Sequence, residues 1–280
     1  MPRRGFTLVE VLVTVMVVFL LVGLLIAGLS LAGQGSRRAA EEQGVSSLDL
    51  AVQQFRSDHG FLPPLVRDDV PVVGSNVAVY SFSPSQANAT DRDYLRGGGI
   101  DPDTSPGDRR YSTRSLAIYL LGSLTSDVDH VDGPGYAGPQ SDGSFRRSGK
   151  RLTDPLVDVS GSAFKVLNED PQAGLVELQD RRGVSYRYYR WLRGVPGQVS
   201  DVVAKVEETN VPDLVGDARE DANLRHADYA IVAAGANRVF GDLGTEGADY
   251  IKQELGLSLS KPDELAKQRA RGDNVVRSGR

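Results

Sequence analysis

The feature that most constrains this chain is an uncharged apolar stretch near its N-terminus, from Val11 to Ala32. The stretch is roughly 22 residues long, and a helix of about that length crosses a hydrocarbon core about 30 Å thick. A short basic leader, Pro2-Arg3-Arg4, precedes it, and a single acid, Glu10, stands at its head. An ionisable side chain inside a membrane segment is costly, so Glu10 calls for a functional partner. The simpler alternative is that Glu10 lies in the headgroup region, where the helix dipole favours an acid.

The residues around the leader resemble a known processing signal. Arg3-Arg4-Gly5, followed by Phe6-Thr7-Leu8-Val9-Glu10 and a long apolar helix, is similar to the class III signal of type IV pilins and type II secretion pseudopilins. The resemblance implies that a membrane prepilin peptidase cleaves between Gly5 and Phe6 at the cytoplasmic face and methylates Phe6. The mature chain then keeps its apolar helix.

The same resemblance gives Glu10 a function in assembly. In a filament its carboxylate neutralises the ammonium group of the processed Phe6 of a neighbouring subunit. The attraction is strong at low dielectric, but desolvation of both charges offsets much of it. We therefore expect this pair to set the register between subunits more than to add net stability.

Two other interpretations of the N-terminus compete with the prepilin signal. A secretory signal peptide has an apolar region of roughly 7–15 residues before a small-residue cleavage site. Ser30-Leu31-Ala32 would serve as that site, but the apolar stretch is too long and Glu10 is out of place. A plain signal anchor fits the length and the basic leader, but it leaves the Gly-Phe-Thr-Leu-x-Glu string unexplained. In both the anchor and the prepilin interpretations, the body of the chain lies outside the cytoplasm.

The helix is predicted to continue beyond the membrane. Gly33 and Gly35 lower helix propensity where the apolar stretch ends, so we expect a weak point there and a resumed helix from Arg37. Gly60 and then Pro63-Pro64 predict its end near residue 59. Four apolar residues recur on one face of this second half: Val45, Leu48, Val52 and Phe55. The pattern predicts that this face packs on a sheet.

Two later segments are similar to the core pseudopilins of type II secretion. Gln54 to Pro63 resembles the segment that closes their long helix, with His59 as a turn residue. Asp180-x-x-Gly183-x-x-Tyr186-x-Tyr188 resembles their Asp-x-x-Gly-x-x-Tyr-x-Tyr hairpin, although it lacks the usual Pro-Trp after the aspartate. Alternation in Leu175–Gln179 and in Ser185–Trp191, on either side of this turn, predicts the same hairpin from the residues alone.

Three more elements follow from local patterns. Arg114 to Leu124 is predicted to be helical, with Ser112 or Thr113 as its cap. Asp228 to Ala234 is an apolar run that predicts a buried strand. A last helix is predicted to be capped by Ser260 and ended by Gly272.

The loop after the buried strand gives the candidate metal site. Gly235 to Asp242 is similar to a loop that, in pseudopilins of this kind, can hold calcium together with the acids that follow it. Asp242, Asp273 and Asn274 are then candidate oxygen ligands, a set that suits a hard cation if the three converge. Asn237 stands where the family's loop carries an aspartate, which removes a charge from the site. The alternative is that all of them are ordinary turn residues. No cofactor is certain from the sequence, and calcium is the one that it suggests.

Composition narrows the remaining functions. The chain has 280 residues, a net charge of −5 and a pI near 5.3, so no basic surface is expected to recruit nucleic acid. It has no cysteine, which excludes disulfides, thiolate metal sites and a lipid-modified N-terminal cysteine. Its three histidines are not spaced as a metal pair, and it has no nucleophile elbow, Walker motif or dinucleotide fingerprint. We expect no enzymatic activity, although a glycosidase-type carboxylate pair is left open because sequence spacing does not give distances in space.

Together these observations predict an α+β protein with the pilin fold. A leader of residues 1–5 precedes a long helix over residues 6–58, which crosses the membrane over about residues 6–32 and packs its amphipathic half on a small antiparallel β-sheet. Residues 59–280 form a globular domain, with a loop-rich central insertion over about residues 65–174 that enlarges it beyond a small core subunit.

The resemblance implies a structural subunit of a periplasmic pseudopilus that serves type II protein secretion. It places the protein in the inner membrane as a single-pass chain, with its C-terminal domain in the periplasm. The implied partners are other pseudopilin subunits, the prepilin peptidase, the inner-membrane secretion assembly platform and the lipid bilayer. A minor pilin of a type IV pilus is one alternative. A membrane-anchored binding or hydrolytic domain that does not polymerise is another.

Overall fold

The computed structural model is an α+β structure with a long N-terminal helix, a four-stranded antiparallel sheet and a separate two-stranded sheet. It divides into two compact units, Met1–Ala40 and Glu41–Arg280, and we call the second unit the head. The residues that the structure describes are 8–68, 77–79, 111–122, 138–140, 143–146, 153–160, 164–170, 175–190, 214–216 and 220–279. Most of the predicted central insertion therefore lies outside the described residues.

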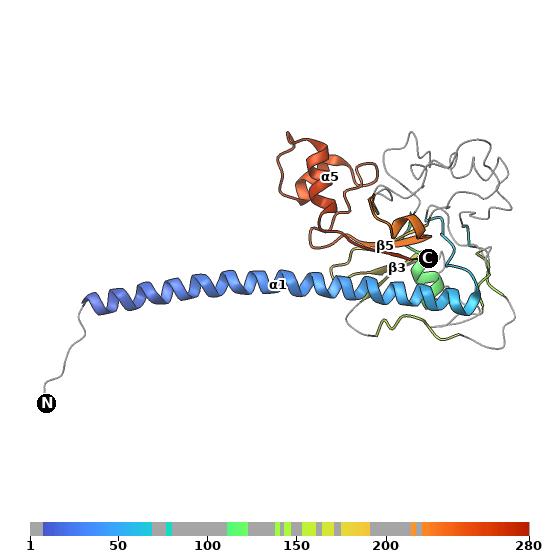
Figure 1. Cartoon of the computed structure of the whole chain (residues 1–280), viewed down its shortest axis with the longest axis horizontal. Helices are drawn as coiled ribbons and strands as arrows, with labels where there is room; N and C mark the ends of the chain where they lie inside the picture. Colours follow the sequence, from blue (N-terminus) through green and yellow to red (C-terminus); the bar gives the residue numbers. More distant parts are fainter. Residues whose placement is uncertain are drawn as a thin grey trace, which may run out of the picture. The chain divides into compact units, whose positions relative to one another are not determined.

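The N-terminal helix α1 is a single helix of 52 residues, Leu8–His59 (Figure 1). The expectation of an interruption near Gly33 and Gly35 is wrong, because the backbone is helical through both residues. Each glycine costs only about 1 kcal/mol in a helix, and regular helix on both sides is enough to offset this. The helix ends as predicted: Gly60 has a left-handed φ of 81°, and its N–H donates to the carbonyl of Arg56 at 2.8 Å.

The first part of α1 is apolar and uncovered. The segment Leu8–Leu25, of 18 residues, is long and apolar enough to cross a membrane. Every side chain in it is exposed, including Phe19, Leu24 and Leu25. A contiguous apolar surface of this kind normally marks a site of contact with lipid or with another protein.

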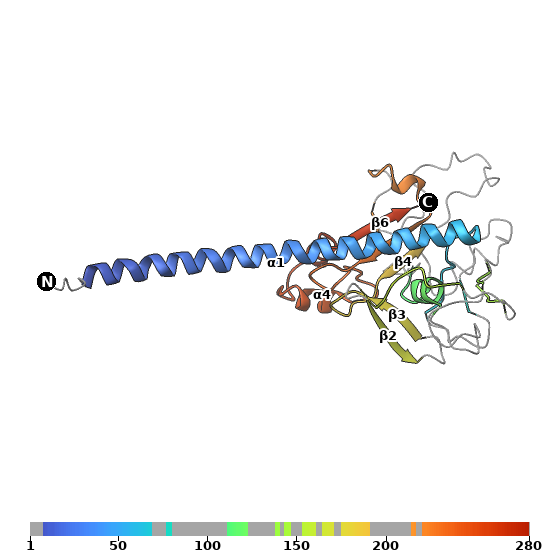
Figure 2. The same ribbon diagram turned by 90° about the horizontal axis from the view of Figure 1, so that it is seen from below.

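The last part of α1 belongs to the head and buries its predicted face there. Val45, Leu48, Val52 and Phe55 are all fully buried, and they share one apolar core with strand residues that include Tyr188 and Ile231. Figure 2 shows this end of the helix lying along the strands. The prediction from residue spacing is therefore confirmed: the amphipathic half of α1 packs on a sheet.

The main sheet has the strand order β1-β4-β5-β6, and all its neighbours are antiparallel. Its strands are β1 (Tyr111–Ser112), β4 (Arg187–Arg190), β5 (Tyr229–Ala233) and β6 (Val275–Gly279). Successive side chains of a strand point to opposite faces. Accordingly, Tyr188 enters the core beneath α1, whereas Tyr189 enters a second core with Leu214, Leu224 and Phe240. The predicted buried strand is confirmed, since every residue of β5 is buried.

The turn of the predicted hairpin is confirmed, but the prediction that its two strands pair along their length is wrong. The N–H of Gly183 donates to the carbonyl of Asp180 at 3.1 Å, and Gln179 bridges Ser185 in antiparallel fashion. Beyond this turn the two strands enter different sheets. Strand β3 (Leu175–Gln179) pairs with β2 (Lys165–Asp170), whereas β4 pairs with β1 and β5. Both edges of β4 are thus occupied, and neither is left for β3.

A short π-helix, η1 (Ala117–Leu121), follows β1 and is entirely buried. Ser112 Oγ accepts hydrogen bonds from the N–H groups of Arg114 at 3.1 Å and Ser115 at 3.0 Å, in the turn that leads into the helix. The N-cap residue of η1 itself is Leu116, which has no side-chain cap. The helix is shorter than predicted, because Gly122 ends it in a left-handed conformation with φ 65°.

The C-terminal part of the head inserts two helices between β5 and β6. These are α4 (Ala248–Glu254) and α5 (Asp263–Arg271), and a 3-10 turn, η4 (Leu224–His226), precedes β5. A small core of Val239, Ile251, Ala266 and Ala270 holds the two helices together. Gly272 ends α5 as predicted, but the Ser260 cap is wrong, because the helix begins directly after Pro262. Pro262 is itself the N-cap residue, with φ −57° and ψ 142°, and it makes no side-chain cap hydrogen bond.

Candidate functional site

The N-terminal candidates are only partly described by the structure. Glu10 lies in the first turn of α1 and is exposed, and the hydroxyl of Thr14 donates to its backbone carbonyl. Gly5 and Phe6, between which the leader is predicted to be cleaved, lie outside the described residues. The structure therefore leaves the proposed Glu10–Phe6 pairing as a prediction.

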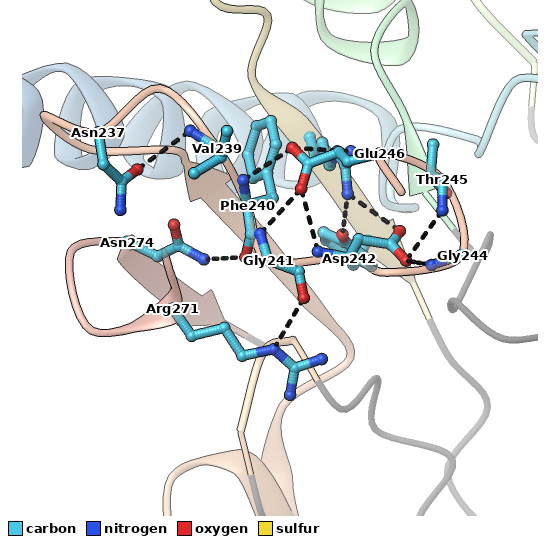
Figure 3. A network of polar contacts seen from close by, with 12 residues as sticks. Asn237, Val239, Phe240, Gly241, Asp242, Gly244, Thr245, Glu246, Arg271 and Asn274 are labelled. Atoms are coloured by element: carbon cyan, nitrogen blue, oxygen red, sulfur yellow. Dashed lines mark hydrogen bonds and ion pairs between the residues drawn. The ribbon is translucent and has the colours of Figure 1, made fainter. Parts of the chain in front are cut away.

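The other candidate region is the stretch Gly235–Glu246 between β5 and α4, which we call the closing loop. The loop begins close to the turn between α5 and β6. Gly235 has φ 70°, and a Cβ there would lie 2.1 Å from the carbonyl oxygen of Asp273. Only glycine fits both conditions. The loop thus packs directly against residues 270–274, as Figure 3 shows for Asn274.

Asn237 connects the closing loop to α5 and to the turn between α5 and β6. Its backbone N–H donates to the Asp273 carboxylate at 2.8 Å, and its side-chain amide donates to the carbonyl of Ala270 at 2.9 Å. Its Oδ1 accepts from the N–H of Val239 at 3.0 Å. An aspartate at this position has no hydrogen to donate to Ala270. The asparagine therefore has a specific structural role, in addition to the loss of charge expected from the resemblance to the pseudopilin loop.

Two further side chains reach the closing loop, one from the last residue of α5 and one from just beyond it. Asn274 Nδ2 donates to the carbonyl of Phe240 at 2.9 Å, and Arg271 Nε donates to the carbonyl of Gly241 at 3.4 Å (Figure 3). Both bonds go to backbone carbonyls, so they fix the path of the loop and do not depend on its side chains.

Glu246 anchors the far end of the closing loop. Its carboxylate accepts hydrogen bonds from three successive backbone N–H groups, those of Phe240 at 2.8 Å, Gly241 at 2.9 Å and Asp242 at 3.1 Å (Figure 3). Successive N–H groups that converge in this way form an anion-binding nest. Here the bound anion is a side chain of the same loop.

Arg187 of β4 supplies a cation to the same loop. Its Nη1 lies 3.2 Å from Asp242 Oδ2, and its Nη2 lies 3.9 Å from Glu246 Oε1. The guanidinium carbon also lies 3.9 Å from the ring centre of Phe240 and 4.3 Å from that of Tyr111. Burial works to lower the pKa of Arg187, but Tyr189, Tyr111 and Glu246 outweigh it, and the net effect raises the pKa. Arg187 is therefore a charged side chain in the interior.

The three predicted calcium ligands lie in one region but have other contacts. Asp242 is only 4% exposed, and its Oδ1 accepts from the N–H groups of Gly244 and Thr245 while its Oδ2 faces Arg187. The Asp273 carboxylate is bound to the N–H of Asn237. Within the described ranges, no three acidic, histidine or cysteine side chains form a group that could hold a metal ion. The surroundings of Asp242 suit calcium poorly, because the guanidinium of Arg187 already neutralises this carboxylate.

Sequence reasoning missed Arg187 and Glu246, and local signals for them are weak. Arg187 alternates with tyrosines in β4, a pattern that also fits an exposed face. Glu246 follows Asp242 by four residues, which hints at a turn but not at a nest. The partner of Arg187 lies across the fold, in a loop 55 residues later. Glu246 binds N–H groups only four to six residues before it, through a backbone geometry that residue type does not reveal.

A half-buried polar group joins the two sheets. Asp68 accepts from the hydroxyl of Ser112 at 2.6 Å and from the N–H of Thr113 at 2.8 Å. The Thr113 hydroxyl lies 2.6 Å from Glu177 of β3, and Ser185 donates to the other oxygen of Glu177. Burial raises the pKa of Asp68, against the opposing effects of Ser112, Thr113 and Arg114. This group holds β1 and β3 together, and its geometry is that of a structural network.

Comparisons with protein-family models, with curated proteins and with solved structures found no match to this chain. The class that the structure defines is correspondingly coarse. It is an α+β protein with one helix long and apolar enough to cross a membrane and with a head built on a small antiparallel sheet. Any finer function has to be argued from the residues themselves.

Proposed function

We propose that this chain is a structural subunit of a periplasmic pseudopilus that serves type II protein secretion. A prepilin peptidase removes the leader between Gly5 and Phe6, and the mature subunit is held in the inner membrane by α1 until it assembles. The head lies in the periplasm, and subunits join through their N-terminal helices.

The observation that carries the proposal is the division of α1 into two parts with opposite surroundings. Its segment Leu8–Leu25 is apolar and exposed throughout, whereas Val45, Leu48, Val52 and Phe55 are fully buried in the head. A bilayer, and later the helices of neighbouring subunits, are the surroundings that remove such a surface from water.

The apolar segment also offers a place for close helix contact. Gly23 lies within it, and a Cβ there would meet no atom within 4 Å. Small residues allow helix backbones to approach closely where lipid leaves no hydrophobic driving force between helices. Glu10, at the exposed start of the same segment, is the residue that we assign to register between subunits.

The experiment that tests processing is the intact mass of the purified mature protein. We expect a chain that begins at methylated Phe6. A chain that begins at Gly33 would indicate signal-peptide cleavage, and a chain that keeps Met1 to Gly5 in the presence of the peptidase would contradict the prepilin interpretation.

The experiment that tests assembly compares Glu10→Ala with Glu42→Ala, a second exposed acid of α1 outside the apolar segment. We expect the Glu10 variant to remain in the membrane fraction but to be absent from sheared filaments, and the Glu42 variant to assemble. An anchored domain that does not polymerise would give no filaments with the unaltered chain. A type IV pilus subunit would give filaments but no defect in secretion when the gene is deleted.

A further inference from the structure

The closing loop has an internal cation that comes from β4. The guanidinium of Arg187 lies between the rings of Phe240 and Tyr111, at 3.9 Å and 4.3 Å from their centres. This arrangement is favourable because the face of an aromatic ring attracts a cation, most strongly away from water. Arg187 is only 5% exposed, so the side chain is fixed by packing as well as by charge.

The acids of the loop are arranged around that cation. Asp242 Oδ2 lies 3.2 Å from Arg187 Nη1, and its Oδ1 is held by the N–H groups of Gly244 and Thr245. Glu246 lies 3.9 Å from Arg187 and places its carboxylate on three successive N–H groups. The two carboxylates therefore have a positive partner and backbone donors without any added ion.

A calcium ion at Asp242 would have to displace these contacts. Calcium takes six to eight oxygen ligands at about 2.3–2.6 Å, whereas Asp242 already faces a guanidinium and two N–H groups. A divalent cation beside Arg187 would also be repelled by its charge. The same loop thus has a cation supplied from within the chain.

We infer that Arg187 is the built-in cation of the closing loop and that the head folds independently of calcium. Asp242 and Glu246 are its counter-ions. Asp273 fixes the loop by accepting from the N–H of Asn237, and Asn274 fixes it through Nδ2, while Asn274 Oδ1 is buried without a hydrogen-bond partner. The cation that links the loop to the sheet is thus a side chain of β4.

The first test is the thermal unfolding of the full chain in detergent micelles, followed by near-ultraviolet circular dichroism, in millimolar calcium and in EGTA. We expect the same Tm in both. A bound ion in large excess over its dissociation constant stabilises the folded state and raises the Tm by several degrees. A rise of this size in calcium that disappears in Asp273→Asn would overturn the inference.

The second test separates the charge of Arg187 from its volume. Arg187→Met keeps much of the packing but leaves Asp242 buried without its cation, and we expect the Tm to fall by roughly 10 °C. Arg187→Lys keeps the charge, and we expect its Tm to fall clearly less than that of Arg187→Met. An equal or higher Tm in the methionine variant would contradict a role for the charge.

If neither variant folds, the comparison of calcium with EGTA in the unaltered chain still decides the question. Both measurements follow the head of a single chain in detergent. Their outcome is therefore separate from whether the chain assembles into a filament.

Discussion

Tyr229 of β5 donates its phenolic hydrogen to Asp49 of α1 at a distance of 2.6 Å, so a hydrogen bond to a carboxylate crosses the interface between helix and sheet. Asp49 also accepts from Gln53 at 3.0 Å and lies 3.9 Å from Arg277 of β6. An apolar interface alone would allow the helix to slide or rotate slightly on the sheet. This directional contact fixes its position.

Tyr229→Phe is expected to lower the free energy of unfolding by about 1–3 kcal/mol, because a buried carboxylate oxygen loses its donor. The matched control is Tyr250→Phe, since Tyr250 is 48% exposed and its change should be within about 0.5 kcal/mol. Denaturant unfolding followed by near-ultraviolet circular dichroism measures both. Equal effects in the two variants would show that the Asp49 contact adds nothing.

Leu48→Ala and Leu50→Ala test the face of α1 that packs on the head. Leu48 is fully buried and Leu50 is 67% exposed, although they lie two residues apart on the same helix. We expect the Leu48 variant to lose about 2–5 kcal/mol of unfolding free energy through lost burial and a cavity, and the Leu50 variant to change little. Denaturant titrations of the two variants under identical conditions compare them. A larger loss at Leu50 would place the other face of α1 against the head.

Asn237→Asp is expected to destabilise the head by about 1–3 kcal/mol, because the carbonyl of Ala270 loses its donor and a carboxylate then faces the negative end of α5. Asn223→Asp, at an exposed position before η4, is the control with the same chemical change. Thermal unfolding measures both variants. If calcium raises the Tm of Asn237→Asp above the Tm of the unaltered chain, the closing loop can form a metal site once an aspartate replaces Asn237.

The raised pKa of Asp68 predicts a pH dependence of stability. Because the pKa of the folded state lies above the ordinary value of 3.8, the contribution of this group is fully present below about pH 3.8 and is lost as the pH rises through the folded-state pKa. The difference in unfolding free energy between the unaltered chain and Asp68→Asn should therefore decrease with rising pH over that window. Unfolding free energies measured at a series of pH values give this difference.

Asp158 provides the control of opposite sign. Its pKa is lowered by hydrogen bonds from Ser160, and it is fully exposed. The contribution of Asp158 is therefore present above the ordinary pKa and is lost as the pH falls through the lowered one. The difference in unfolding free energy between the unaltered chain and Asp158→Asn should therefore increase with rising pH, opposite to the difference for Asp68→Asn. If the difference for Asp68→Asn does not decrease with rising pH, the assignment to Asp68 is wrong.

Local patterns were sufficient for the elements whose contacts lie close in sequence. The spacing of Val45, Leu48, Val52 and Phe55 predicted the buried face of α1, and Gly60 predicted its end. The Ser112 hydrogen bonds and the turn Asp180–Gly183 likewise depend on neighbours within a few residues. Such features are determined by backbone geometry and residue type, which a sequence displays directly.

The remaining features depend on contacts between distant residues. The sequence did not reveal that β3 and β4 separate after their shared turn, because that depends on β1 and β5 occupying both edges of β4. Nor did it reveal that Arg187 meets Asp242 inside the molecule. The calcium prediction rested on residue types in a loop, whereas the suitability of the loop depends on a cation from another strand.

The alternation along β4 also bears on how the chain avoids misfolding. Tyr188 belongs to the core under α1, whereas Arg187 and Tyr189 face the closing loop on the other side. Pairing β4 one residue out of place would exchange the two faces. A guanidinium would then enter an apolar interior without an acid, at a cost of several kcal/mol. The side chains of β4 themselves thus disfavour the shifted register.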